Sequence, residues 1–176
     1  MALLFHTREA TLHVTTIGYG NFGTAQTVAK MRQLVNSSLT DPVVIQVARG
    51  IGMAFYPRDT DSQARAIKEY LKDHFQFIND PRGVELLVAP RPMLDTISKR
   101  GIVAGDCDEA AILGAALGKA IGMRARFVLL GFTGAAGPYA HVFAILRGAN
   151  SWVSLDVTKP LRGPFPPVTR HTSVEV

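Results

Sequence analysis

The only cysteine of the chain, Cys107, stands in the stretch AGDCDEAAILGAALGKAIG at residues 104–122, where acidic residues precede an apolar run. A free thiol is a weak nucleophile at neutral pH because its pKa is about 8.5 and the thiolate is the reactive form. The first turn of a helix favours the thiolate, since unpaired N–H groups and the positive end of the helix dipole face it. A helix that begins here therefore makes Cys107 a candidate nucleophile, and it supplies a backbone N–H suited to an oxyanion hole.

Acidic neighbours oppose the ionisation of this thiol. Asp106, Asp108 and Glu109 suit the start of a helix, but their charges disfavour a thiolate, so a cationic partner is required. Histidine is the natural partner, and the chain has five, at positions 6, 13, 74, 141 and 171. His141 follows the glycine-containing stretch GAAGPYA and opens the apolar segment HVFAILR, a kind of junction where catalytic groups are common.

A hairpin around Gly148 is predicted by the segment HVFAILRGANSWVSLDV, residues 141–157. A two-residue loop, or a four-residue loop in the same register, would place Ile145 opposite Trp152 and His141 opposite Asp156. Asp156 would then hold the imidazole ring and stabilise its cationic form. A three-residue loop would put the two side chains on opposite faces, so the sequence permits the productive register and leaves the other open.

The elements that must position these side chains follow from the apolar periodicity. Asp41-Pro42 is typical of a helix start, although the β-branched residues that follow leave a strand open as well. Thr60 and Gln63 match a capping box at the start of the clearest amphipathic helix. The expected elements are a strand at 10–17, helices at 24–39, 60–75 and 106–121, a loop at 79–92, and strands at 124–131, 141–147 and 151–157.

Helices followed by a run of strands that must pair antiparallel predict an α+β fold, with the cysteine helix packed against an antiparallel sheet. We expect an N-terminal strand and helix extension over residues 1–55, a core over residues 56–160, and an irregular proline-rich tail over residues 161–176.

Three stretches resemble the transglutaminase-like superfamily of papain-like cysteine enzymes: GDCDEAAILGAALGKAIGMRARFV, HVFAIL and WVSLDVT. They occur in the order of that family, which is cysteine helix, histidine strand and aspartate strand, and the resemblance covers residues 60–160. It implies a papain-like fold with Cys107 as nucleophile, His141 as general base and acid, and Asp156 as the orienting acid. The chain departs from the family in having Phe143 where a tryptophan is common.

The resemblance implies attack of the thiolate on a carboxamide, release of an amine and a thioester intermediate. Water resolves the thioester in a peptidase or amidase, the favoured function, and an amine resolves it in a protein transamidase, the alternative. The substrate is expected to be a peptide or protein carboxamide, with Trp152 and Tyr139 as candidate substrate-binding residues. A third hypothesis is a non-catalytic assembly module, for instance a phage virion component that docks to a larger assembly through its N-terminal segment.

Composition argues against several other classes of protein. The net charge is +5, but the basic residues are scattered, which favours a solvated surface over a nucleic-acid site. One cysteine excludes an internal disulfide and thiolate-rich zinc sites, and no metal or cofactor is expected. The apolar runs are too short to cross a membrane and the first residues do not resemble a signal peptide, so we expect a cytoplasmic protein, or a virion protein if a phage encodes it.

A glycine motif offers a rival hypothesis. GYGNFG, residues 18–23, matches the G-x-G-x-x-G pattern of dinucleotide sites, between an expected strand and an expected helix. The acid expected after a second strand is missing, because Asp41 precedes the next apolar run and is joined to Pro42. A glycine turn, as in a hairpin or docking loop, is therefore the favoured interpretation.

Overall fold

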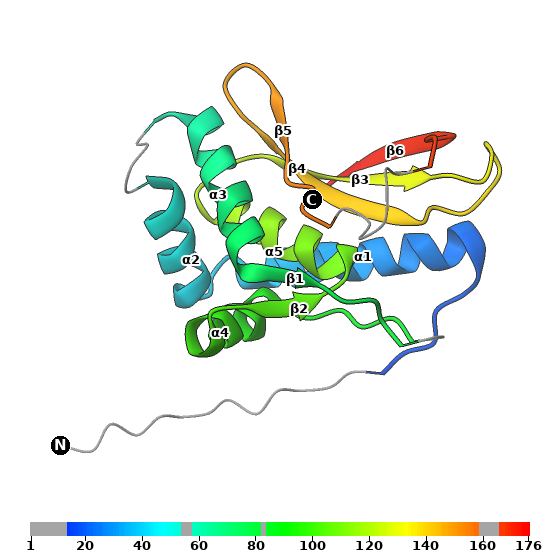
Figure 1. Ribbon diagram of the computed structural model, residues 1–176, viewed down its shortest axis with the longest axis horizontal. Helices are drawn as coiled ribbons and strands as arrows, with labels where there is room; N and C mark the ends of the chain where they lie inside the picture. The colour runs from blue at the N-terminus through cyan, green and yellow to red at the C-terminus, as the bar shows by residue number, and fades with distance from the viewer. Residues whose placement is uncertain (1–13, 54–57, 82–83, 159–165) are drawn as a thin grey trace.

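The cysteine-bearing helix α5, Cys107–Ala120, lies at the centre of the computed structural model, which describes residues 14–53, 58–81, 84–158 and 166–176. Every residue of α5 from Asp108 to Gly118 is buried, because the sheet covers one side of the helix and other helices cover the rest (Figure 1). A helix that is apolar on all sides belongs inside a core, and the run AAILGAALG supplies that character.

Four antiparallel strands form the main sheet, in the order β5-β4-β3-β6. They are β3 (Ala125–Gly131), β4 (His141–Arg147), β5 (Trp152–Ser154) and β6 (Arg170–Glu175). In β3 every second residue is buried, and Phe127 and Leu129 join the core that α5 occupies. The α+β prediction, with the cysteine helix on an antiparallel sheet, is therefore confirmed.

The C-terminal tail departs from its prediction. Arg170–Glu175 was expected to be irregular, but it pairs with β3 from Gly131 to Arg126 as strand β6. Thr172 and Val174 are half-buried while their neighbours are exposed, which is the period-two pattern of a strand with one face on the core. The irregular tail was predicted from its prolines, and the alternation over residues 170–175 is too short to indicate a strand by itself. Residues 161–165 lie outside the described residues.

The helices on the far side of α5 are α1 (Gly20–Ser38), α2 (Pro42–Ala48) and α4 (Pro90–Arg100), and α2 continues into a π-helical turn, Arg49–Met53. The N-cap carboxylate of Asp41 accepts a hydrogen bond from Val43 N at 2.8 Å, so the helix alternative after Asp41-Pro42 is the correct one. Residues 14–17 form no strand, and the rest of the strand expected at 10–17 lies outside the described residues.

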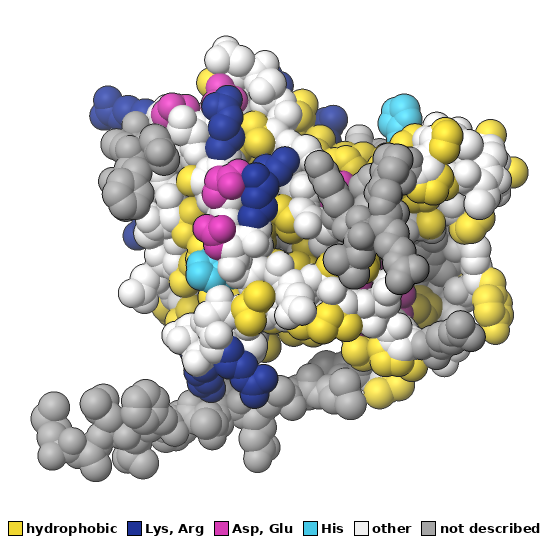
Figure 2. Space-filling model, viewed as in Figure 1, with side chains coloured by type: hydrophobic (Ala, Val, Ile, Leu, Met, Phe, Trp, Pro, Cys, Tyr) yellow, Lys and Arg dark blue, Asp and Glu magenta, His cyan; other side chains and the backbone are white. Residues whose placement is uncertain are grey.

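The amphipathic helix α3, Thr60–His74, is present, but its cap differs from the prediction. Asp59 is the N-cap and accepts from Ser62 N at 3.0 Å, so the Thr60–Gln63 capping box is wrong and Gln63 is buried instead. The charged side chains of α3 form a mixed surface (Figure 2), which agrees with the solvated face expected there.

A small parallel pair, β1 (Phe75–Phe77) with β2 (Val103–Gly105), was not predicted. It joins the end of α3 to the residues just before Cys107, and α4 connects its two strands. The loop expected at 79–92 is therefore shorter, because Pro90 begins a helix as a proline at the first helical position can. Among the described residues, no helix has the length and apolar character that a membrane crossing requires.

Candidate active site

Cys107 is the first residue of α5, as the sequence predicted, and its side chain is half-buried. Asp106 is the N-cap, and its carboxylate accepts from Asp108 N at 2.9 Å. Glu109 reaches back to accept from Asp106 N at 3.0 Å, which completes a capping box around the cysteine. The second oxygen of Glu109 accepts from Val88 N at 3.2 Å, so this buried carboxyl also ties the segment before α4 to the start of α5.

The thiol of Cys107 is held in its neutral form. Burial raises its pKa well above the ordinary range and the charge of Asp108 raises it further, while the Val142 backbone N–H acts in the opposite direction. The Sγ–H donates to Asp108 Oδ1 at 3.6 Å. Burial first, and the charge of Asp108 second, therefore outweigh the effect of the helix start on the pKa of this thiol.

The pKa values of the acids beside the thiol are also shifted. Burial, followed by a hydrogen bond with Glu85, raises the pKa of Asp108 well above its usual range. Burial likewise raises the pKa of Glu109 to about 8, so this carboxyl keeps a proton through much of the neutral range. The sequence placed these acids beside the thiol, but only the tertiary burial shows that they resist ionisation.

His141 and Asp156 are in contact: Nε2 lies 3.1 Å from Asp156 Oδ2, and both side chains are largely shielded from solvent. The carboxylate also accepts from Thr158 through the backbone N at 3.3 Å and Oγ1 at 3.4 Å. Burial raises the pKa of Asp156, but the hydrogen bond and charge of His141 outweigh it and the net pKa is lowered. The carboxylate is thus fixed in its ionised form against one ring nitrogen.

The hairpin register behind this contact differs from the prediction by two residues. Arg147 pairs with Trp152 and Ile145 with Ser154, around a four-residue loop, so the expected pairs Ile145–Trp152 and His141–Asp156 are wrong. A shift of two leaves every side chain on the same face of the sheet. Extended beyond Ser154, the observed register makes His141 and Asp156 diagonal neighbours, which is close enough for their contact.

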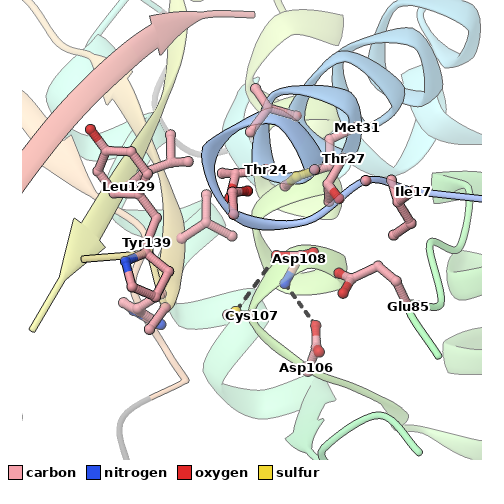
Figure 3. A pocket seen from close by; sticks show the side chains of 18 residues that line it. Ile17, Thr24, Thr27, Met31, Glu85, Asp106, Cys107, Asp108, Leu129 and Tyr139 are labelled. Carbon is pink, nitrogen blue, oxygen red and sulfur yellow. Dashed lines mark hydrogen bonds between the residues drawn. The ribbon is translucent and has the colours of Figure 1, made fainter. Parts of the chain in front are cut away.

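Cys107 and His141 line the same cavity, which encloses about 400 Å³. Tyr139 lines it too, and the Arg170 guanidinium lies 4.0 Å from the centre of its ring. Figure 3 shows Leu129 and Tyr139 on one side of Cys107 and Glu85 on the other. The opposite wall comes from the start of α1: Gly18, Gly20, Gly23, Thr24, Thr27, Val28 and Met31. Sequence reasoning did not connect this segment with the cysteine.

Trp152, the other candidate substrate-binding residue, does not line this cavity. It begins β5 at the far end of the hairpin, and its ring lies 4.7 Å from the Arg126 guanidinium. The tryptophan packs against arginine on the sheet, so its position gives no support to the predicted substrate contact.

The glycine motif forms the turn into α1. Gly20 has a φ of 59°, and a side chain at Gly23 would collide with the Gly18 carbonyl oxygen. Residues 14–17 are not a strand and the four-stranded sheet is antiparallel, so the context of a dinucleotide site is missing from the described residues. The motif serves as a close backbone turn at the cavity wall.

Two groups of side chains in the described part of the chain bring potential metal ligands within 4.8 Å of one another: Asp106, Cys107 and Asp108, and Asp80, Asp106 and Glu109. Asp106, Asp108 and Glu109 are already engaged in the hydrogen bonds of the helix start. These contacts account for both groups without an ion.

Comparisons with known proteins identify the family of the chain. The family model of the transglutaminase-like superfamily matches residues 46–157, which include Cys107, His141 and Asp156. A solved structure from Cytophaga hutchinsonii, described as "a putative cysteine protease", is similar at 19% identity with a TM-score of 0.48. The match covers 76% of this chain and 47% of that one, so the chain spans about half the length of the protein it resembles. No curated protein matches the chain. Because the family model covers well over half of its residues, the chain belongs to the transglutaminase-like superfamily.

Proposed function

We propose that this protein is a cysteine-dependent peptidase or amidase, with Cys107 as nucleophile, His141 as general base and acid, and Asp156 as the group that orients His141. One observation carries the proposal: the imidazole that Asp156 holds at 3.1 Å lines the same cavity as the thiol at the start of α5. A nucleophile and a base that line one cavity, with a carboxylate that holds the base, are the parts that acyl transfer requires.

The resting thiol is neutral, so its activation belongs to the attack itself. With Nε2–H donating to Asp156, Nδ1 of His141 is the nitrogen that takes the Cys107 proton as sulfur bonds to the carbonyl carbon. Asp156 stabilises the imidazolium that results. The Cys107 backbone N–H, in the first turn of α5, is the proposed donor to the developing oxyanion.

The remaining steps return every group to its starting state. The C–N bond breaks, His141 gives its proton to the departing amine, and a thioester to Cys107 remains. Water then attacks the thioester carbon while His141 takes a proton from it. The C–S bond breaks, the proton returns to sulfur, and a carboxylic acid leaves. An amine in place of water would give transamidation by the same steps.

The raised pKa of Cys107 is the observation that favours a second candidate, a non-catalytic assembly module with an inert thiol. In that case the segment around α1 would contact a larger assembly, and the thiol would be a buried core group. The two candidates differ in whether an acyl group ever becomes attached to the sulfur.

A trapping experiment tests this difference. The purified chain is incubated with a panel of peptide amides, quenched in acid, and analysed by mass spectrometry for a thioester on Cys107. The expected result is an adduct and a free amine with the native chain, and neither with His141→Ala. His171→Ala is the matched control, because His171 is an exposed histidine on β6. The absence of an adduct and of turnover across the panel would reject the enzyme in favour of the assembly module.

Glycine methyl ester in the same reactions assigns the acyl acceptor. Hydrolysis gives the carboxylic acid product even in the presence of the amine, as we propose. A predominant N-acyl glycine methyl ester would instead identify a transamidase.

A further inference from the structure

A second groove continues the cavity of Cys107 on the side of α1 and β6. The two hollows share four walls, Thr24, Val28, Leu129 and Tyr139, and the groove encloses about 260 Å³. Its other walls are Asn21, Ala25, Ala29, Arg32, Thr172 and Val174. The cavity and the groove therefore form one continuous path along the start of α1.

Small side chains on α1 keep this groove open. Val28 of α1 points into the core, whereas Ala25 and Ala29 beside it are exposed and rise little above the helix surface. Thr172 and Val174 of β6 lie across from them and are half-buried. The floor is apolar, since it consists of aliphatic side chains and the Tyr139 ring, and it suits an apolar side chain.

The two ends of the path differ in their polar side chains. Glu85, Asp106 and Asp108 line the cavity beside the sulfur. Arg32 is the charged residue among the walls of the groove, so the far end of the path carries a cation. A ligand that spans the path meets carboxyl groups at one end, apolar surface in the middle and the Arg32 guanidinium at the other end.

We propose that the groove binds the acyl side of a peptide substrate: an apolar side chain lies against Val28, Leu129 and Tyr139, and an adjacent acidic side chain approaches Arg32. The proposal rests on the function proposed for Cys107. The proposal places the acyl part of the substrate past Tyr139 in the groove and leaves the departing amine on the side of Glu85.

Both elements that build the outer walls, α1 and β6, lie outside residues 46–157, the segment that the family model matches. The proposed preference for an apolar side chain beside an acidic one is therefore a property of the flanking segments of this chain.

Binding is measured separately from catalysis. The Cys107→Ala chain is titrated calorimetrically with blocked tetrapeptide amides that contain Leu-Glu, Gly-Glu, Leu-Lys or Gly-Lys in a glycine background. We expect the Leu-Glu peptide to bind about tenfold more tightly than either the Gly-Glu or the Leu-Lys peptide. Ala29→Phe, which fills the groove from an exposed helix position, should abolish the leucine preference. Arg32→Glu should reverse the preference for glutamate over lysine.

Matched variants on the same helix test whether any added ring or any reversed charge on α1 changes peptide binding. Gln33→Phe adds the same ring to an exposed position of α1, and Lys30→Glu reverses a charge at a half-buried position of the same helix. Neither residue lines either hollow. Both should keep the preferences of the parent chain. Equal binding of the four peptides, or a leucine preference that survives Ala29→Phe, would overturn the proposal.

Turnover by the chain with Cys107 intact tests the direction. Leucine should raise kcat/KM about tenfold when it precedes the cleaved bond and have little effect when it follows that bond. A preference on the following side would overturn the assigned direction. Selective binding without any turnover would reject the proposed catalysis and leave the groove confirmed as a peptide site, so the two failures are distinguishable.

Discussion

His141 Nε2 and Asp156 Oδ2 lie 3.1 Å apart although the two residues are not partners in the β4–β5 ladder. The paired residues of β5 end at Ser154, and Asp156 reaches the ring diagonally from the segment that follows. Thr158 holds the other carboxylate oxygen. The contact is therefore set by the four-residue hairpin loop and by the turn after β5 together.

Asp156→Asn is expected to lower kcat/KM by about 10²- to 10⁴-fold, because the amide cannot stabilise the imidazolium of His141. Thermal unfolding should show that the variant remains folded. Asp95→Asn is the control, since Asp95 is a carboxylate that pairs with Arg91 on α4 and does not line the cavity. Activity of Asp156→Asn equal to that of the control would contradict the role of Asp156.

Asp108→Asn is expected to make the thiol more reactive. Asp108 accepts from the Cys107 Sγ–H and its charge raises the pKa of that thiol, so the neutral amide should lower the pKa. Removing a charge at this range is worth on the order of 1–2 kcal/mol, so the rate of iodoacetamide labelling at pH 8 should rise about tenfold. The same Asp95→Asn control should label at the native rate. An unchanged rate in Asp108→Asn would show that burial alone keeps the thiol neutral.

Stability is expected to fall as the pH rises from about 4.5 to about 8, as urea denaturation across that range would show. The pKa of Glu109 is raised from 4.5 to about 8 in the folded chain, so the folded state binds more protons than the unfolded state in this window. Its contribution is fully present below the unfolded pKa and is lost towards the folded one, at up to about 1.4 kcal/mol per pH unit. Glu109→Gln should flatten this slope, and a native chain whose stability stays constant or rises between pH 5 and 8 would contradict the prediction.

Gly118→Ala is expected to destabilise the chain by about 1–3 kcal/mol, measured as the free energy of unfolding in urea. A Cβ at this position of α5 would lie 2.3 Å from the fully buried Leu146 side chain of β4, which has no room to withdraw. Gly50→Ala is the matched control, because a Cβ there meets nothing within 4 Å. A loss of stability in both variants alike would point to the backbone and not to the helix–sheet contact.

The parts of the site that depend on local sequence were predictable. The start of α5 is fixed by capping residues within one turn, so Asp106 and Cys107 were placed correctly. Alternation along the hairpin determines which face a side chain takes, so the two-residue and four-residue loops both placed His141 and Asp156 on one face, although the observed register is two residues off. The sequence left the three-residue loop open as well, and the observed loop has four residues.

The parts that depend on distant contacts were not predictable in the same way. Strand β6 and the β1–β2 pair are short, and they become strands through partners far along the chain. The wall that α1 contributes to the cavity, and the burial that raises the pKa of Asp108 and of Glu109, are likewise tertiary effects with no local pattern.

Because the chain has a single cysteine at the start of α5, the reactivity of that cysteine can report on the opening of this helix. Cys107 begins a helix whose next eleven residues, Asp108–Gly118, are all buried, and the chain has no second thiol to complicate the signal. Alkylation of Cys107 at rising urea concentration therefore reads the free energy needed to open this end of α5. Comparison with the free energy of global unfolding then shows whether the end of α5 opens locally or only when the whole chain unfolds.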